Sequence, residues 1–430
     1  MIYLLNNRMG VFIVGTINTG DTAFVIISTA LVFLMTPGLA LFYGGMVKRK
    51  NVLSTIMSSF FICGLASVLW VAVGYSLSFG KDIGGIIGSL DWAFFNGVTG
   101  EANASYAATI PHTLFAAFQM MFAIITPALI TGALVERMKF STLFVFIGLW
   151  SIIVYYPMAH MVWAEGGLLR NLGAIDFAGG NVVHISSGVS AVVASIILGK
   201  RKGYGITSSQ PHNIPLVFIG AALLWFGWFG FNAGSALGSG ELAVHALLTT
   251  NTSAATALLS WMLVEKITRG KPTMLGAATG AVVGLVAITP GAGFVPIWAS
   301  LIIGAAVSPI CYFAMSVIKP KFGYDDALDA FGCHGIGGIW GGIATGIFAK
   351  NSINPVAQWD GLIFGETRLF IAQIISIGVT IALAIVGTAI IMWVLKLVTK
   401  EIRVMPREES EGLDISQHGE SAYPSFTGMD

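Results

Sequence analysis

Stretches of about 20 apolar residues recur along almost the whole chain, and they restrict its fold more than any other feature. A helix that crosses the hydrocarbon core of a bilayer needs about 20 consecutive, mostly apolar residues. Eleven such windows can be counted, at approximately residues 22–47, 51–79, 112–135, 141–163, 181–199, 213–237, 242–264, 272–290, 293–318, 331–349 and 367–397. The pattern therefore predicts an all-α polytopic membrane protein with eleven transmembrane helices.

The composition supports this prediction and leaves little room for a soluble domain. Charged residues make up only 10% of the chain, whereas about 25% is usual in soluble domains. We expect a short extracellular N-terminus (1–20), a transmembrane domain (21–400) and a cytoplasmic C-terminal tail (401–430). The formal net charge of +1 argues against nucleic acid as a partner.

Lys and Arg are concentrated in alternate loops, which predicts the orientation of the chain. Lys48–Lys50 and Lys200–Lys202 belong to the rich set, as does the region after the last span. By the positive-inside rule these segments face the cytoplasm, so the N-terminus lies outside. An odd number of spans also places the two ends on opposite sides. We expect a multi-pass protein of the cell (plasma) membrane in contact with the lipid bilayer.

Two histidines, His184 and His334, stand near the starts of the fifth and tenth spans. An ionisable side chain at membrane depth is costly and indicates a functional site by default. Each histidine has an aspartate eight residues upstream, Asp176 and Asp326. Five spans separate the two units, and an odd offset reverses the direction of the chain. This spacing predicts an inverted repeat, with repeat one at about 21–200, repeat two at about 213–350 and helix 11 at about 367–397.

Small residues accompany both histidines at helical spacing. Gly338, Gly342 and Gly346 follow His334 in steps of four, and Gly188 follows His184. Small residues on one face let helix backbones approach closely, so we expect the histidines to lie where two helices pack tightly. Two alternatives remain open at this point. The histidines can be packing residues that satisfy each other, or a pair of haem ligands, which no CxxCH motif supports.

The aspartates have a simpler interpretation. A carboxylate at the start of a helix accepts hydrogen bonds from the free N–H groups and is favoured by the helix dipole. We expect Asp176 mainly to cap the fifth span, with attraction of cations as a secondary role. Asp326 is expected to cap the tenth span in the same way.

Aromatic residues recur at helical spacing in the third and sixth spans. Phe118 and Phe122 belong to the third span, Phe231 and Ser235 to the sixth, and Trp163 closes the fourth. Such residues usually belong to the core or to the interfacial belt. The alternative is a cation site, because aromatic faces attract small cations and a serine hydroxyl accepts a hydrogen bond.

Five segments closely resemble the ammonium transporter family, the Amt branch of the Amt/Mep/Rh superfamily: FYGGMVKRKNVLS, AHMVWAEGGLL, DFAGGNVVHI, GWFGFNAGSA and FGCHGIGGI. The resemblance covers about residues 21–425. It implies an eleven-helix, channel-like fold that assembles as a homotrimer, with one pore per subunit and no cofactor. One departure is visible, since Ala164 and Glu165 stand where a shorter all-glycine turn is expected after Trp163.

The resemblance also implies roles for individual residues. They are Phe118, Phe122, Trp163 and Ser235 for the outer ammonium site, Phe122 and Phe231 for the gate, His184 and His334 for the pore, and Asp176 as a structural and recruiting aspartate. Asp329 matches another recurrent acidic position. Ammonium is then recruited at the outer site and deprotonated, and ammonia passes the gate and the twin histidines. The tail resembles the family's cytoplasmic tail, which packs on neighbouring subunits and transmits regulation by PII-type signalling proteins.

Three other functions remain to be weighed. An ammonium sensor would use the same outer site and signal through the tail, but the tail offers little room for an output domain. A neutral gas channel of the Rh type would not need the aromatic cation site. A membrane enzyme is not expected, because neither a nucleophile–base pair nor a cluster of metal ligands is visible.

Overall fold

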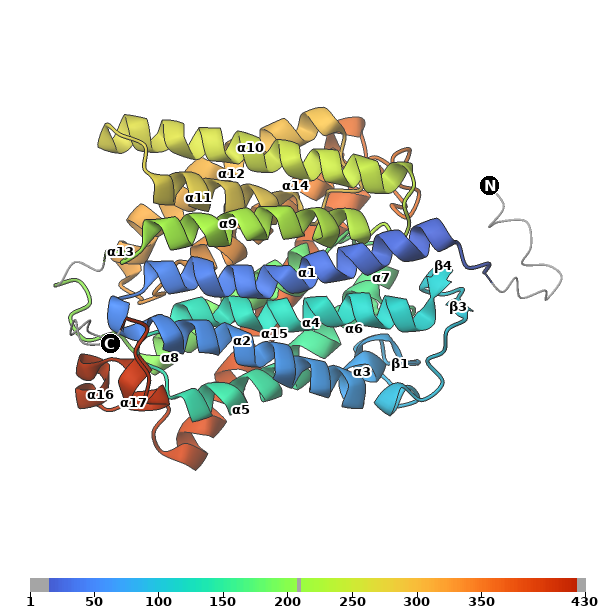
Figure 1. Cartoon of the computed structure of the whole chain (residues 1–430). Coiled ribbons are helices and arrows are strands. Elements are labelled where there is room, and N and C mark those ends of the chain that lie inside the picture. Colours follow the sequence, from blue (N-terminus) through green and yellow to red (C-terminus); the bar gives the residue numbers. More distant parts are fainter. Residues whose placement is uncertain (1–14, 207–209, 424–430) are drawn as a thin grey trace.

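The computed structural model describes residues 15–206 and 210–423, and it consists of long helices that run side by side (Figure 1). Residues 1–14 and 424–430, which belong to the expected N-terminal segment and tail, lie outside the described residues. We call the end of the bundle where α1 (Thr19–Met46) begins the N-terminal face. The opposite end, which carries α16 (Pro406–Glu411) and α17 (Leu413–His418), is the tail face.

The helices follow the apolar windows. The remaining α-helices are α2 (Val52–Leu69), α3 (Tyr75–Phe79), α4 (His112–Leu134), α5 (Phe140–Trp150), α6 (Tyr156–Trp163), α7 (Leu168–Asn171), α8 (Ser186–Leu198), α9 (Ile214–Trp228), α10 (Glu241–Arg269), α11 (Met274–Ile288), α12 (Ile297–Phe313), α13 (Lys319–Phe322), α14 (Gly337–Phe348) and α15 (Arg368–Thr399). Short π-helical turns join several of them into longer helices, namely η2 (Trp70–Gly74), η4 (Ser151–Tyr155), η5 (Gly180–Ile185), η6 (Phe229–Ala233), η7 (Ala314–Ile318) and η8 (Phe331–Ile336). The 3₁₀ turns are η1 (Arg49–Asn51), η3 (Ala93–Phe95) and η9 (Leu362–Phe364).

The predicted fold class is confirmed. Nine helical segments of the described chain are long and apolar enough to cross a membrane. The other two windows coincide with the shorter helix α11 and with the continuous helix made by η8 and α14. The exact number of spans stays a prediction.

Two small antiparallel hairpins depart from the purely helical expectation. One pairs β1 (Asp82–Ile83) with β2 (Ile87–Gly88), and the other pairs β3 (Ala102–Asn103) with β4 (Ala107–Pro111). Both lie in the segment between α3 and α4, at the N-terminal face (Figure 1).

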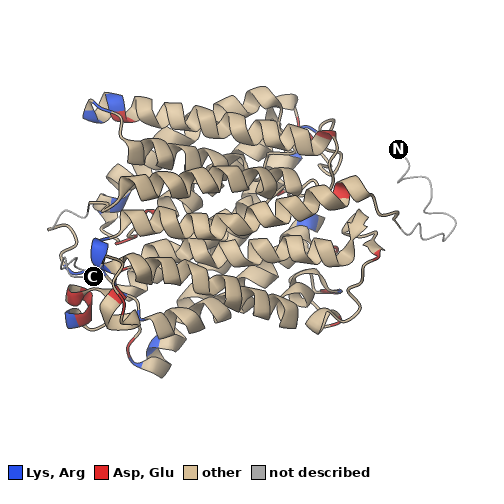
Figure 2. Ribbon diagram, in the orientation of Figure 1, with Lys and Arg blue, Asp and Glu red and all other residues tan. Residues whose placement is uncertain are grey.

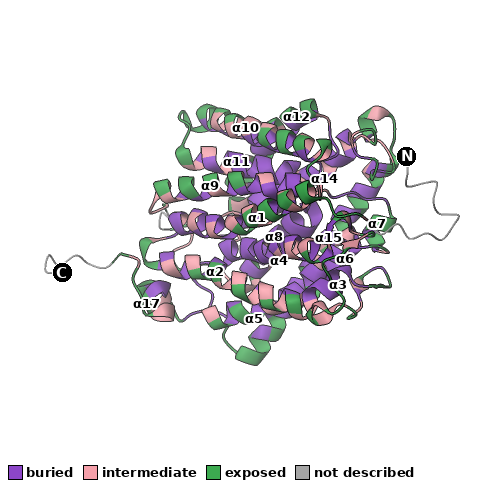
Figure 3. Cartoon of the chain, turned by 45° about the vertical axis from the view of Figure 1, so that its right-hand side comes forward, coloured by how far each residue is buried: buried purple, intermediate pink, exposed green. Residues whose placement is uncertain are grey.

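The surface has the character expected of a protein in a bilayer. Charged residues gather at the two ends of the bundle, while the middle is almost free of them (Figure 2). Buried residues fill the centre of the bundle, and the outward faces of the helices are exposed (Figure 3). Large apolar side chains are exposed there, including Phe60, Val68, Leu259 and Trp393. In water this would be unfavourable, so these faces are suited to contact with lipid.

Side chains in the loops define where several helices begin. Asn18 accepts a hydrogen bond from the Asp21 N–H at the start of α1, and Asn213 does the same for Leu216 in α9. Thr273 caps α11 by accepting from the Gly276 N–H. Each cap satisfies an N–H group that has no partner inside its helix. At these three helices the loop thus ends with a residue whose side chain caps the helix that follows.

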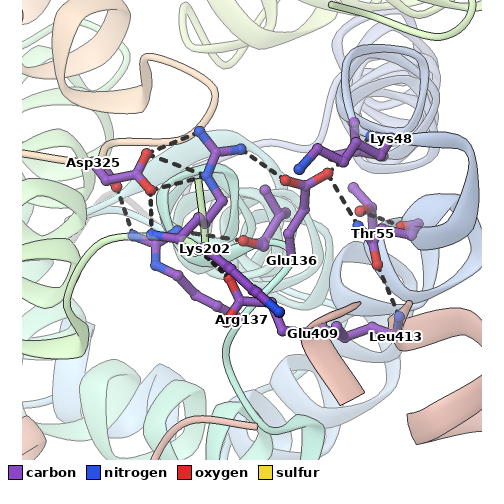
Figure 4. A network of polar contacts seen from close by, with 12 residues as sticks. Lys48, Thr55, Glu136, Arg137, Lys202, Asp325, Glu409 and Leu413 are labelled. Carbon is purple, nitrogen blue, oxygen red and sulfur yellow. Dashed lines mark hydrogen bonds and ion pairs between the residues drawn. The ribbon is translucent and has the colours of Figure 1, made fainter. Parts of the chain in front are cut away.

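The described part of the tail is helical and docks on its own chain. The Leu413 N–H donates to the side-chain oxygen of Asn51, and the Ser54 N–H donates to the Asp414 carboxylate at 2.8 Å. The same region holds a network of ion pairs that joins loops far apart in the sequence (Figure 4). The described part of the tail is therefore an ordered part of the tail face.

Candidate functional site

Three cavities follow one another through the bundle. The first, about 180 Å³, lies at the N-terminal face and is lined by Trp163 and Ser235 among others. The second has only about 20 Å³ and is lined by His184 and His334. The third, about 790 Å³, lies toward the tail face and includes Asp329 in its lining.

Side chains separate the cavities from one another. Phe122 lines the first cavity and Phe231 the second, and the centres of their rings are 4.5 Å apart with the planes tilted by 39°. Both rings are buried. Leu328 and Cys333 line both the second and the third cavity. The three cavities thus form one route that is interrupted by contacting side chains.

The first cavity offers an aromatic surface and a hydroxyl oxygen. Trp163 ends α6, and its indole N–H donates to the Asp176 carbonyl at 2.9 Å. Its ring stands edge-on to Phe122, with 5.9 Å between ring centres. The Ser235 hydroxyl donates to the Phe231 carbonyl at 2.8 Å, which leaves its oxygen free to accept. This combination suits a small cation that carries N–H donors.

Phe118 lies behind Phe122 and is not among the residues that line the first cavity. Its ring is fully buried and packs against Phe122 in an edge-to-face contact, with 5.0 Å between ring centres. Phe115 and Gln119, on the neighbouring stripe of α4, line the cavity in its place. Phe118 therefore does not line the cavity and can affect it only by supporting Phe122.

The two histidines lie next to each other in the middle of the route. His184 belongs to η5 and His334 to η8, and their rings are nearly parallel with 5.3 Å between centres. The helices approach closely here, because a Cβ atom added at Gly188 would stand only 2.1 Å from the backbone nitrogen of Gly335. The expected tight packing at the histidines is confirmed.

Three of the four imidazole nitrogens are buried without hydrogen-bond partners. In the described chain this holds for both nitrogens of His184 and for Nδ1 of His334. The two rings stack on each other without a hydrogen bond between them, which disfavours the alternative in which the histidines satisfy each other. Buried polar atoms are nearly always paired in native structures, so these nitrogens are available to a bound molecule. A cavity of about 20 Å³ accommodates one water-sized molecule, which needs roughly 10–15 Å³. The site can therefore bind one small molecule that donates and accepts hydrogen bonds.

The two aspartates cap the helices that carry the histidines. The Asp176 carboxylate accepts from the backbone N–H groups of Gly179, Gly180 and Asn181 and, at 3.3 Å, from that of Val182. Asp326 accepts from the backbone N–H groups of two residues at the start of η8, Ala330 and Phe331. Each carboxylate thus holds the start of a π-helical turn that presents a histidine.

Charges gather at the tail-face end of the route. Burial raises the pKa of the Asp326 carboxyl to about 6, although the nearby Lys319 ammonium acts in the opposite direction. Lys319 also forms an ion pair with Asp329 at 2.7 Å. Asp329 adopts a left-handed backbone conformation, with φ of 58°, and lies beside the third cavity.

Comparison with known proteins identifies this arrangement. Residues 23–423 match the model of the Ammonium Transporter Family. The chain belongs to the ammonium transporter family. It is 53% identical to the ammonium transporter of Bacillus subtilis (strain 168), over 94% of this chain and 98% of that protein. It is 47% identical to ammonium transporter Amt1 of Archaeoglobus fulgidus, over 94% and 99% of the two chains.

Solved structures of the same family have the same fold. Mep2 of Saccharomyces cerevisiae superposes with a TM-score of 0.87 at 34% identity, covering 96% of this chain and 93% of that one. A sensor Amt protein superposes with a TM-score of 0.84 at 30% identity, covering 93% and 98%. This ammonium transporter family member is therefore a multi-pass membrane transporter and not an enzyme.

The motifs did not identify two residues that border the first cavity of this family member. Tyr106 comes from the segment between β3 and β4, and its hydroxyl donates to the Phe79 carbonyl. Arg170 comes from α7, and its guanidinium donates to the Trp163 carbonyl at 2.7 Å. Its position seven residues after Trp163, beyond a glycine turn, was the available signal.

The departure from the family pattern leaves Trp163 in place. Ala164 is buried, and its N–H donates to the His160 carbonyl at the end of α6. Gly166, with φ of 84°, turns the chain back toward α7. Glu165 is exposed and its backbone N–H donates to the Tyr106 hydroxyl. The longer turn therefore changes the chain at the surface and leaves the position of Trp163 unaffected.

The described part of the chain offers no cluster of metal ligands. Within residues 15–206 and 210–423, no group of three or more His, Cys, Asp or Glu side chains could hold a metal ion. Cys311 and Cys333 are buried free thiols, and Cys63 is half-buried.

Proposed function

We propose that this protein carries ammonium or ammonia across the cell membrane through the three cavities. In this proposal the N-terminal face is outside and the tail face is cytoplasmic, in agreement with the Lys and Arg loops. The observation that carries the proposal is the second cavity, in which unpartnered imidazole nitrogens border a space of about 20 Å³. A hydrated ion does not fit there, whereas one ammonia molecule does.

Capture takes place in the first cavity. The ring faces of Trp163 and Phe122 attract ammonium by its charge, and Ser235 accepts one of its hydrogen bonds. Phe118 supports the position of Phe122. Potassium is a competing cation of similar size, but it has no N–H groups to donate to Ser235. The site therefore combines attraction by charge with selection by hydrogen bonding.

Deprotonation precedes passage beyond the rings of Phe122 and Phe231. An unpaired charge in an apolar medium costs far more than a neutral polar molecule. Ammonium therefore loses a proton before the gate, and neutral ammonia enters the second cavity when the rings move apart. Asp176 keeps the start of η5 in place and adds negative charge near the entrance.

The histidines replace the hydrogen bonds that ammonia loses on leaving water. A neutral imidazole has one nitrogen that donates and one that accepts, and ammonia does both. His184 and His334 therefore offer complementary partners in an otherwise apolar space. Leu328 and Cys333 border the exit toward the third cavity, where water is again available.

Assembly and regulation form the second part of the proposal. The protein acts as a homotrimer in the lipid bilayer, with one pore in each subunit, as the family resemblance implies. A PII-type signalling protein is the expected partner at the tail face. The docked tail supports this role, because Leu413 and Asp414 bind the polar groups of Asn51 and Ser54 at the start of α2.

An ammonium pulse on proteoliposomes tests transport directly. The purified protein is reconstituted, and both internal pH and membrane current are recorded. We expect an ammonium-dependent signal that protein-free liposomes do not give, and no signal from an equal pulse of potassium. The similarity to a sensor Amt protein makes a receptor the second candidate function. Ammonium binding without any transport signal would favour that function and exclude the proposal.

Ser235→Ala tests the selection step. A hydrogen bond that involves a charged group contributes about 1.5–3 kcal/mol, so we expect the KM for ammonium to rise at least about tenfold. The preference over potassium should fall in parallel. Ser239→Ala is the matched control, because Ser239 bonds to Asp21 at the same face and lies outside the lining of the first cavity. An unchanged KM in Ser235→Ala would remove this hydroxyl from the site.

A further inference from the structure

His160 is a buried histidine that the proposed transport route does not use. It lies on the last turn of α6, one turn before Trp163, and its side chain is fully buried. Its Nδ1 is 3.1 Å from the Ser78 carbonyl oxygen, and its Nε2 is 2.9 Å from a carboxylate oxygen of Asp82. Both ring nitrogens are thus held by partners from the segment that precedes α4.

Both partners accept hydrogen bonds and have none to donate. A carbonyl oxygen only accepts, and the same Asp82 oxygen already accepts from the Gly85 N–H at 2.8 Å. The imidazole therefore has an acceptor at each ring nitrogen, and it can act toward them only as a hydrogen-bond donor. Ser78 lies near the C-terminal end of the helix formed by α2, η2 and α3, where carbonyl oxygens have no partner inside the helix. The hydrogen bond from His160 also holds the pKa of the Asp82 carboxyl below its ordinary value.

The hairpin that carries Asp82 encloses the segment around Trp163 from both sides. Before Trp163, Asp82 binds His160. After it, the Leu168 N–H at the start of α7 donates to the Gly85 carbonyl at 2.8 Å. Between them, a Cβ atom added at Gly166 would stand 2.7 Å from the Cβ atom of Asp82. The hairpin therefore packs on the turn that directly follows Trp163.

We propose that the hydrogen-bonded His160–Asp82 pair is a positioning device for the first cavity. It fixes the end of α6 against the β1–β2 hairpin, so that the indole of Trp163 keeps its place on the cavity wall. His160 and Asp82 do not line the first cavity, so their effect passes through Trp163. The inference rests on the proposed capture of ammonium by Trp163. It adds that a surface hairpin sets the affinity of the site.

Transport kinetics of three variants test this inference. His160→Gln and Asp82→Asn each disrupt the imidazole–carboxylate contact with little change of volume, and Asp82→Glu keeps the carboxylate. We expect the first two to raise the KM for ammonium about tenfold with little change in kcat, since a small displacement of a binding group is costly. Asp82→Glu should retain most of the wild-type affinity. His245→Gln is the matched control. His245 lies on α10, and its imidazole makes one hydrogen bond, to the Val295 carbonyl.

The double variant separates positioning from general destabilisation. Two residues that act as one unit are not additive, so His160→Gln/Asp82→Asn should have a KM no higher than the worse single variant. Full additivity of the two changes, or an unchanged KM in both single variants, would overturn the inference. If His160→Gln does not fold, Asp82→Asn alone decides, because Asp82 is partly exposed on the hairpin. Transport by the wild type is measured in the same series, so failure of the proposed function is recognised separately.

Discussion

Replacing both His184 and His334 by alanine should reduce ammonium-dependent transport in proteoliposomes at least about 100-fold. Each imidazole offers ammonia a hydrogen bond in a space where no other partner is available, and leaving a small polar molecule unpaired costs about 2–7 kcal/mol. Even the lower figure corresponds to more than tenfold per site at 1.4 kcal/mol per decade. The single variants should lie between the wild type and the double variant. Internal pH after an ammonium pulse is the measurement.

Two further observations give this experiment a clear outcome. Alanine also enlarges the cavity of about 20 Å³, so the potassium current must be recorded to detect loss of selectivity. His212→Ala is the matched control, because His212 lies at the tail face and bonds to the Val47 carbonyl. Wild-type transport by the double variant would show that the histidines are not part of the path. Loss of transport in His212→Ala as well would point to a general effect on folding.

The general architecture could be predicted because the membrane imposes strong rules on sequence. A window of about 20 apolar residues has few alternatives to a helix, and each of the eleven windows coincides with helical structure. The meeting of His184 and His334 could also be predicted in outline. Gly188 faces Gly335 at the predicted close approach. The other small residues that follow His334 do not pack on the helix of His184. Gly342 and Gly346 face Ile377 and Gln373 of α15, which the spacing did not predict.

The local backbone at the site could not be predicted. His184, His334 and Phe231 all lie on π-helical turns. Such turns change which residues share a face, yet no spacing of apolar residues encodes them, and they recur at functional sites. The position of Phe118 shows the same limit. Its spacing of four from Phe122 is compatible with a position on the cavity wall or behind it. Which of the two positions it takes depends on how α4 packs against its neighbours.

The polar network at the tail face was also beyond sequence reasoning, because its members are far apart in the chain. Arg201 binds the Asp325 carboxylate through two nitrogens, each 2.9 Å from an oxygen, across 124 residues. A third nitrogen binds Glu136 at 2.9 Å. Glu136 in turn accepts from Asn51, whose side chain holds Leu413 of the tail (Figure 4). The positive-inside rule accounts for the Lys and Arg residues but not for their acidic partners.

Asp325→Asn should be strongly destabilising. Asp325 and Glu136 are buried and Arg201 is nearly so, and removing one partner of a buried ion pair costs about 3–5 kcal/mol. We expect a lower temperature of unfolding in detergent and faster proteolysis of the tail. The tail is affected because the residue after Arg201, Lys202, binds its Glu409. Glu401→Gln is the control, since it breaks the exposed pair with Lys139 and such pairs contribute little.

The pH dependence of this difference follows from the carboxyl groups. Burial acts to raise the pKa of Asp325 and of Glu136, but the partners of each carboxylate together outweigh it. They are Arg201 and Arg137 for Asp325, and Arg201, Lys48 and Asn51 for Glu136, so both pKa values lie below the ordinary values. A group with a lowered pKa stabilises the folded state above its unfolded pKa, about 4 for these side chains, and loses that contribution as the pH falls through the folded value. The wild type should therefore exceed Asp325→Asn in stability at neutral pH, and the gap should close only in strong acid. A variant as stable as the wild type at pH 7 would mean that the cost of desolvating these charges equals their attraction.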